Sequence, residues 1–246
     1  MVDLLYCEIL KLKRSKMFLF SIMGAAAAPV MCFIGCIKSK LQYYPDGIIT
    51  FGKMFSETNL YTLVLVGVTL YGVITAYLFS REYTENTLKS ILTIPVAKTK
   101  FFVGKHIVLF LWIMALTLIS WLLTFILGVI VQLEGLDLRI LFDSLGHYLS
   151  GGFLVYLLTT PFVLITLWFK NLVPTIIFSV IITMGNAAVL NDVDFVSLYP
   201  WSATYVIASG EVVTKYPLVD SYIVVFALSI IGFAASLAYF RKMDIR

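Results

Sequence analysis

Long apolar runs separated by short polar segments dominate the pattern along this chain. Six runs of about 20 residues contain no Asp, Glu, Lys, Arg or His; they cover residues 17–37, 60–79, 107–131, 149–169, 172–190 and 222–240. A helix of about 20 apolar residues crosses the roughly 30 Å hydrocarbon core of a bilayer. Lipid offers the backbone no hydrogen-bond partner, so these runs are predicted to be helices. The pattern predicts an all-α polytopic membrane protein with six transmembrane helices, forming a single transmembrane domain over residues 1–246.

The distribution of Lys and Arg predicts the orientation of these helices. With both termini in the cytoplasm, 13 of the 18 Lys and Arg residues fall in cytoplasmic segments, as the positive-inside rule requires. This N-in/C-in topology places residues 38–59, 132–148 and 191–221 outside. Residues 80–106 form the long cytoplasmic loop, and Lys170-Asn171 joins the fourth and fifth helices as a tight hairpin.

Composition excludes other broad classes of protein. Hydrophobic residues make up 61% of the chain and charged residues 13%, whereas soluble domains have about half and a quarter. This excess of apolar residues excludes both a soluble domain and a disordered chain. The net charge of +4 does not indicate nucleic-acid binding, because the positive residues flank the apolar runs.

The apolar runs lack the residues that membrane catalysis or proton coupling needs. No carboxylate or histidine lies within them, and His106 and His147 are expected at opposite membrane faces, where they cannot share a metal. The chain has no P-loop motif, so any ATPase must be a separate protein. We therefore predict no catalytic, cofactor-binding or metal-binding residue. An ion-coupled secondary transporter and a non-transporting membrane scaffold remain as alternatives.

Residues 1–16 are predicted to form an amphipathic helix at the inner membrane interface. The apolar face comprises Val2, Leu5, Ile9 and Leu12, and the opposite face comprises Glu8, Lys11 and Arg14.

The cytoplasmic loop is predicted to contain a second short helix, over residues 84–93. Glu85 and Lys89 have the favourable i,i+4 order, and Pro95 marks the end of the helix. Leu88, Ile91 and Leu92 then form an apolar patch outside the lipid. Such a patch is suited to docking a partner, but it could equally fold back on the ends of the transmembrane helices.

Three features of the chain resemble the permease subunit of type-2 ABC transporters, in the small six-helix branch of bacitracin and lantibiotic self-protection exporters. The first is the opening segment from Glu8 to Lys16, which is similar to the family's E-x-x-K interfacial helix. The second is the segment Arg81-Glu82-Tyr-Thr-Glu-Asn-Thr87-Leu88-Lys89-Ser-Ile91-Leu92-Thr-Ile-Pro95, followed by basic residues and Gly104-Lys105. The third is the six-helix layout. The chain lacks a Trp near Lys89, so the cargo is not narrowed to lantibiotics.

The resemblance implies a coupling helix in the cytoplasmic loop that docks on ABC ATPase subunits, which would bind ATP and Mg. The residues it assigns to docking are Glu8, Lys11, Arg81, Glu82, Thr87, Leu88, Lys89, Ile91, Leu92 and Pro95. It also implies pairing with a second permease chain, the same or similar. The cargo would be amphipathic, such as an antimicrobial peptide, moved out of or away from the bacterial cytoplasmic membrane.

The outer segment 191–221 and the pathway lining complete these expectations. The family places re-entrant helices in this segment, which would include Tyr199, Pro200, Trp201 and Tyr205, although an aromatic belt at the membrane interface explains the same residues. Uncharged polar residues are expected to line the pathway, namely Thr62, Thr69, Thr117, Ser120, Ser179 and Asn186.

Overall fold

The computed structural model describes residues 2–13, 15–40, 49–85, 98–210 and 212–242. The helices are α1 (Val2–Lys13), α2 (Lys16–Lys38), α3 (Phe51–Tyr61), the π-helix η2 (Thr62–Val66), α4 (Gly67–Thr84), α6 (Lys98–Ile130), α7 (Leu138–Leu157), α8 (Thr160–Phe169), α9 (Val173–Val189), α10 (Pro200–Ser209) and α11 (Leu218–Lys242). Within these ranges the fold is helical, apart from an isolated β-bridge between Thr50 and Glu134. The all-α prediction is confirmed.

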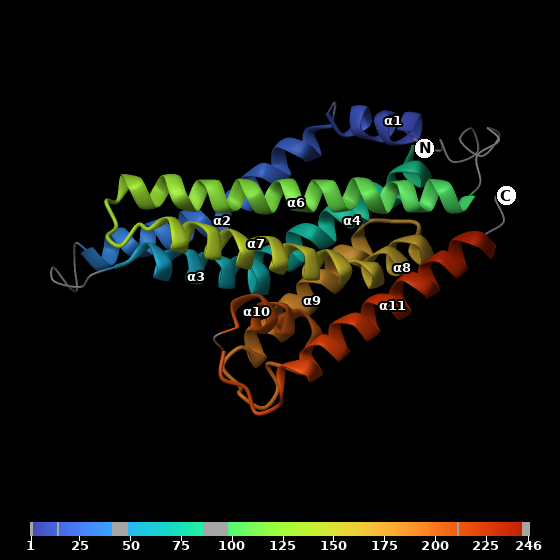
Figure 1. The fold of residues 1–246 in the computed structure, drawn as a ribbon. Helices are drawn as coiled ribbons and strands as arrows, with labels where there is room; N and C mark the ends of the chain where they lie inside the picture. Colours follow the sequence, from blue (N-terminus) through green and yellow to red (C-terminus); the bar gives the residue numbers. More distant parts are fainter. Residues whose placement is uncertain (1, 14, 41–48, 86–97, 211, 243–246) are drawn as a thin grey trace.

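The helices form an elongated bundle with two distinct ends (Figure 1). In the described residues, five helical segments are long and apolar enough to cross a membrane, and α9 is a shorter apolar helix. The first described helix and the end of α11 lie at the same end of the bundle, together with the end of α4 and the start of α6 (Figure 1). The end of α2, the start of α3 and the turn from α6 to α7 lie at the opposite end (Figure 1). Because α1 and the end of α11 lie at the same end, the chain between them runs from one end of the bundle to the other an even number of times.

Several predicted loops are shorter than the sequence suggested, because helices extend into them. The predicted bounds of the loop 80–106 are wrong at both ends, because α4 continues to Thr84 and α6 begins at Lys98. The outer loop 38–59 is also wrong, because α3 begins at Phe51 and runs through η2 into α4 as one helical segment of 34 residues. The outer segment 132–148 is helical from Leu138 onward.

The predicted hairpin between the fourth and fifth helices is confirmed. α8 ends at Phe169, and Lys170 adopts a left-handed conformation with φ 52°. The backbone N–H of Val173 donates to Asn171 Oδ1 at 3.1 Å as α9 begins. The Thr166 and Thr175 hydroxyls are 2.8 Å apart, which ties the two helices together near the turn.

The outer segment 191–221 contains the short helix α10, which packs within the bundle against α7, α11 and η2. Pro200 stands in the first turn, where a missing N–H costs nothing, and Gly210 ends the helix with φ +64°. Trp201 is 5% exposed and stacks on Phe162 at 5.8 Å. Trp201 is therefore a packing residue inside the protein.

Candidate functional site

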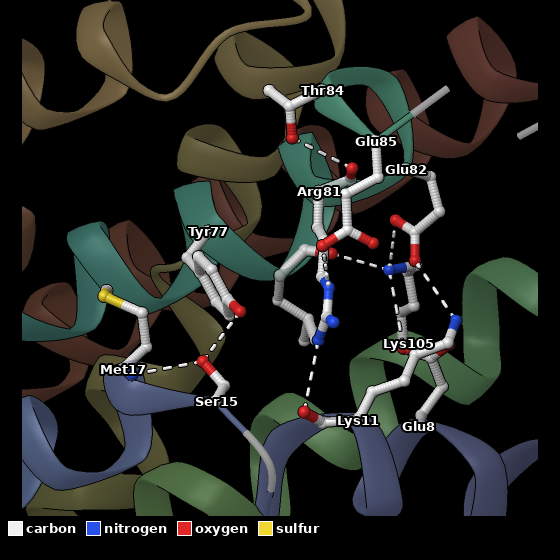
Figure 2. A network of polar contacts seen from close by, with 11 residues as sticks. Glu8, Lys11, Ser15, Met17, Tyr77, Arg81, Glu82, Thr84, Glu85 and Lys105 are labelled. Carbon is white, nitrogen blue, oxygen red and sulfur yellow. Dashed lines mark hydrogen bonds and ion pairs between the residues drawn. The ribbon is translucent and has the colours of Figure 1, made fainter. Parts of the chain in front are cut away.

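Four charged side chains from three helices meet at the end of the bundle that holds α1 (Figure 2). Glu8 and Lys11 come from α1, Glu82 from α4 and Lys105 from α6. Lys105 Nζ lies 2.6 Å from Glu82 Oε2 and 3.6 Å from Glu8 Oε2. Lys11 Nζ lies 2.7 Å from Glu8 Oε1 and 3.8 Å from Glu82 Oε1. We call these four residues the buried charge cluster.

Three of the four side chains in the buried charge cluster are removed from solvent, and the cluster is balanced in charge. Glu8 is 4% exposed, and Glu82 and Lys105 are each 2% exposed. Lys105 Nζ also donates to the Leu78 carbonyl at 2.6 Å. Two carboxylates face two ammonium groups, so each buried charge has an opposite partner. Breaking one partner of such a buried pair costs about 3–5 kcal/mol, because the remaining charge is left uncompensated.

The balance of charges also determines the state of Glu8, which stands outside the membrane-spanning helices. Burial alone raises the pKa of a carboxyl group. Lys105 and Lys11 outweigh that effect and hold the pKa of Glu8 below its usual value. Glu8 is therefore ionised at neutral pH and pairs with both lysines.

Further hydrogen bonds attach α1 to α4. Arg81 Nη1 donates to the Lys11 carbonyl at 3.3 Å, which is among the last four carbonyls of α1 and has no partner inside the helix. Arg81 Nε also pairs with Glu85 at 2.8 Å. At the turn into α2, the Ser15 hydroxyl accepts from the Met17 N–H at 3.1 Å and lies 2.7 Å from the Tyr77 hydroxyl. The second half of α1 and the turn that follows it are thus held against α4.

An aromatic wall surrounds Lys105 on the bundle side. Its Nζ lies 5.7 Å from the Phe79 ring centre and 5.3 Å from that of Phe101, within cation–π range. His106 is buried between Phe79 and Phe102, and its Nδ1 lies 3.1 Å from the Phe102 carbonyl. A cavity of about 10 Å³ borders Glu82 and Lys105, room for about one water molecule. This low-dielectric surrounding strengthens the ion pairs.

The structure brings part of the predicted docking set together. Glu8, Lys11, Arg81 and Glu82 are neighbours, but the Glu8 and Glu82 carboxylates face inward. Thr87, Leu88, Lys89, Ile91, Leu92 and Pro95 lie outside the described residues. The predicted faces of the first helix are partly wrong, since Glu8 is buried beside Leu12 and Ile9 is 46% exposed. The reason is that α6 supplies Lys105 as a partner for Glu8.

Sequence reasoning missed Lys105 as a site residue. It stands at the edge of an apolar run, where a lysine normally serves as a topology signal. The available signal was Glu82, which occupies the matching position at the end of the preceding apolar run. Two opposite charges at the facing ends of consecutive helices can pair across the bundle.

The residues expected to line a pathway are mostly buried between helices of this chain. Thr62, Thr117, Ser120, Ser179 and Asn186 are each 5% exposed or less. Thr117 bonds to Tyr71, Thr69 bonds to Thr183, and Asn186 Nδ2 donates to the Val64 carbonyl. In this structure Thr69, Thr117 and Asn186 hold helices together. Across the part of the chain that the structure describes, no group of three His, Cys, Asp or Glu could hold a metal.

The fold defines a helical, multi-pass membrane protein. The buried charge cluster joins the ends of α1, α4 and α6 by ion pairs. A family model described as "ABC-2 family transporter protein" matches residues 4–186, so the chain belongs to the ABC-2 transporter family. It is similar to the bacitracin transport permease protein BCRB of Bacillus licheniformis, with 48% identity over 207 residues. That match covers 84% of this chain and 99% of the relative. The chain is thus a permease of the bacterial cytoplasmic membrane.

Proposed function

We propose that this chain is the membrane subunit of an ATP-driven exporter for an amphipathic antimicrobial peptide, with bacitracin as the first candidate. The family membership supports a permease, and the similarity to a bacitracin transport permease supports the cargo. A separate ABC ATPase would bind ATP and Mg, and two permease chains, the same or similar, would pair in the membrane. Membership of the ABC-2 transporter family argues against the two alternatives, a secondary transporter and a non-transporting scaffold.

The buried charge cluster is the observation that carries the proposed mechanism. Residues 86–97 connect α4 to α6, and Glu82 and Lys105 stand just before and after that connection. Their 2.6 Å ion pair joins the two helices, and Glu8 joins α1 to both. A force applied at residues 86–97 would therefore move the ends of α1, α4 and α6 as one body.

Surface exposure separates two roles among the predicted docking residues. The Lys11 side chain is 35% exposed, Arg81 20% and Glu85 47%, so these side chains reach the surface at the ends of α1 and α4. In our proposal they contact the ATPase together with the apolar patch of Leu88, Ile91 and Leu92. Glu8 and Glu82 then act as positioning residues beneath that surface. ATP binding closes the ATPases, and the joined helix ends follow.

Co-purification with a co-expressed ABC ATPase from the same organism tests the docking step. The variant Leu88→Asp/Leu92→Asp should lose the ATPase while keeping its gel-filtration profile. A matched control, Leu136→Asp/Val213→Asp, makes the same chemical change at exposed positions near the other end of the bundle. The control should retain the ATPase. If the Leu88→Asp/Leu92→Asp variant keeps the ATPase as well as wild type does, the docking proposal is wrong.

Survival of a bacitracin-sensitive bacterium tests the cargo. Cells that express the permease together with its ATPase should tolerate more bacitracin than cells that express either subunit alone. Equal sensitivity in all three strains, with the complex present in the membrane, would contradict bacitracin as the cargo.

A further inference from the structure

A polar pocket lies at the other end of the bundle, between α3, α7 and α10. It has a volume of about 440 Å³ and is lined by Lys53, Glu57, Asn59, Asp143, His147 and Tyr205, among others. This volume falls within the range of sites for small ligands. None of the pocket residues belongs to the buried charge cluster.

The pocket and the buried charge cluster are connected by one helical segment. Asn59 and Glu82 both lie in the continuous helix from Phe51 to Thr84. Their separation of 23 positions along the chain corresponds to roughly 35 Å of helix, slightly more than the hydrocarbon core of a bilayer. With the predicted orientation, the pocket opens on the outer side.

One buried side chain in the pocket has no partner. Asn59 is 3% exposed, and its Oδ1 makes no hydrogen bond with any described residue. Its polar neighbours are already engaged: Ser144 accepts from Trp121 Nε1 at 3.0 Å, and the Tyr148 hydroxyl donates to the Phe55 carbonyl at 3.3 Å. A buried acceptor without a donor is costly, so Asn59 is suited to receive an N–H from a ligand.

The charges at the rim indicate which kind of donor fits. Glu57 and Asp143 both line the pocket, with side chains 46% and 64% exposed. Lys53 Nζ lies 3.9 Å from Glu57, and Arg139 Nε lies 3.7 Å from Asp143. The Arg139 side chain is 87% exposed and does not line the pocket, so two carboxylates face one lysine within the lining. Phe55, Tyr148 and Tyr205 supply apolar walls. A ligand group that combines an ammonium with an apolar body meets each of these features.

We propose that this pocket binds an amine-bearing, partly apolar group of the peptide cargo, with Asn59 accepting at the base and Glu57 and Asp143 attracting the positive charge at the rim. The inference rests on the proposed function, because it assigns the pocket to the exported peptide. It adds a recognition site on the outer side, on the same helix that carries Glu82.

Binding of bacitracin to the purified permease tests the proposal. Trp121 reports on the pocket, because its Nε1 bonds to Ser144 in the wall, so a change in tryptophan fluorescence gives the Kd. Replacing both rim carboxylates, Glu57→Gln/Asp143→Asn, should weaken binding by at least roughly tenfold, since a hydrogen bond to a charged group is worth about 1.5–3 kcal/mol. Asn59→Leu should weaken binding to a similar degree.

A matched control removes a carboxylate outside the pocket. Asp194 pairs with Lys215 at 3.2 Å and is exposed in the outer segment, so Asp194→Asn should bind as wild type does. The rim variant changes exposed side chains without changing their shape, so it should fold even if Asn59→Leu does not. Raising the salt concentration should weaken wild-type binding more than binding by the rim variant.

The outcomes separate this inference from the proposed function. Wild-type affinity in the folded rim variant would overturn the pocket assignment, while the export function would stand. Wild-type permease that protects cells but does not bind bacitracin in isolation would also overturn the pocket. If wild type neither binds nor protects, the cargo assignment itself is wrong, and the pocket inference falls with it.

Discussion

Replacing Lys105 with Met tests whether the buried charge cluster stabilises the protein as the distances imply. Met fills a similar volume without a charge, so the change removes the ion pairs to Glu82 and Glu8 and the hydrogen bond to the Leu78 carbonyl. Two buried carboxylates then share Lys11, whose ammonium lies 3.8 Å from Glu82. The remaining negative charge must stay buried or take up a proton.

The expected loss follows from the burial of these groups. Leaving one member of a buried ion pair uncompensated costs about 3–5 kcal/mol. For a chain of this length each kcal/mol corresponds to roughly 2–4 °C in the unfolding midpoint, so the drop should be roughly 6–20 °C. The double variant Glu82→Gln/Lys105→Met removes both charges. It should recover part of the loss, because no unpaired charge from this pair remains buried.

Thermal unfolding of the detergent-solubilised permease, followed by gel filtration, measures these midpoints. Arg139→Met is the control, because Arg139 and Asp143 are paired at 3.7 Å on the surface with side chains 87% and 64% exposed. Such exposed pairs contribute little, so the control midpoint should stay near that of wild type. A Lys105→Met midpoint that matches the control would refute the reasoning about the cluster.

Three further predictions concern single positions. The pKa of Glu8 is lowered in the folded protein, so its contribution is complete above about pH 4.5 and is lost as the pH falls through the lower native value; the midpoint should fall in acid more for wild type than for Glu8→Gln. Gly67→Ala should lower the midpoint through a cost of about 1–3 kcal/mol, because an added Cβ would clash with the Thr62 carbonyl oxygen; an unchanged midpoint would rule out the π-helix at this point. Asn186→Leu removes the 2.9 Å donor to the Val64 carbonyl and should cost about 1–3 kcal/mol, measured by the same unfolding assay; a neutral effect would contradict this hydrogen bond.

The sequence predicts the helices well where hydropathy alone decides them. The apolar runs and the Lys170-Asn171 hairpin are found because lipid requires long apolar helices and a two-residue link leaves few geometries. The start of α3 at Phe51 could also have been predicted, because Phe51, Met54, Phe55 and Thr58 recur at helical spacing. All four are buried in the structure. The polar residues among them led to a loop being expected instead.

The site was harder to predict because it depends on contacts between distant residues. A charged residue considered alone is predicted to face solvent. Glu82 and Lys105 are nevertheless buried, because each neutralises the charge of the other. The π-helix likewise depends on a partner far along the chain, since Asn186 satisfies the Val64 carbonyl. α8 begins at Thr160 with Pro161 in its first turn, which is a local signal in the sequence.

Peptide-stimulated ATP hydrolysis tests most directly whether the buried charge cluster couples the ATPase to the membrane helices. The measurement uses the permease and its ATPase reconstituted together in lipid vesicles, with bacitracin added. The account predicts that wild type is stimulated and that Glu82→Gln/Lys105→Met, which retains the docking segment and the ATPase, is not. A double variant that assembles with the ATPase and is stimulated to the wild-type level would contradict this role of the cluster.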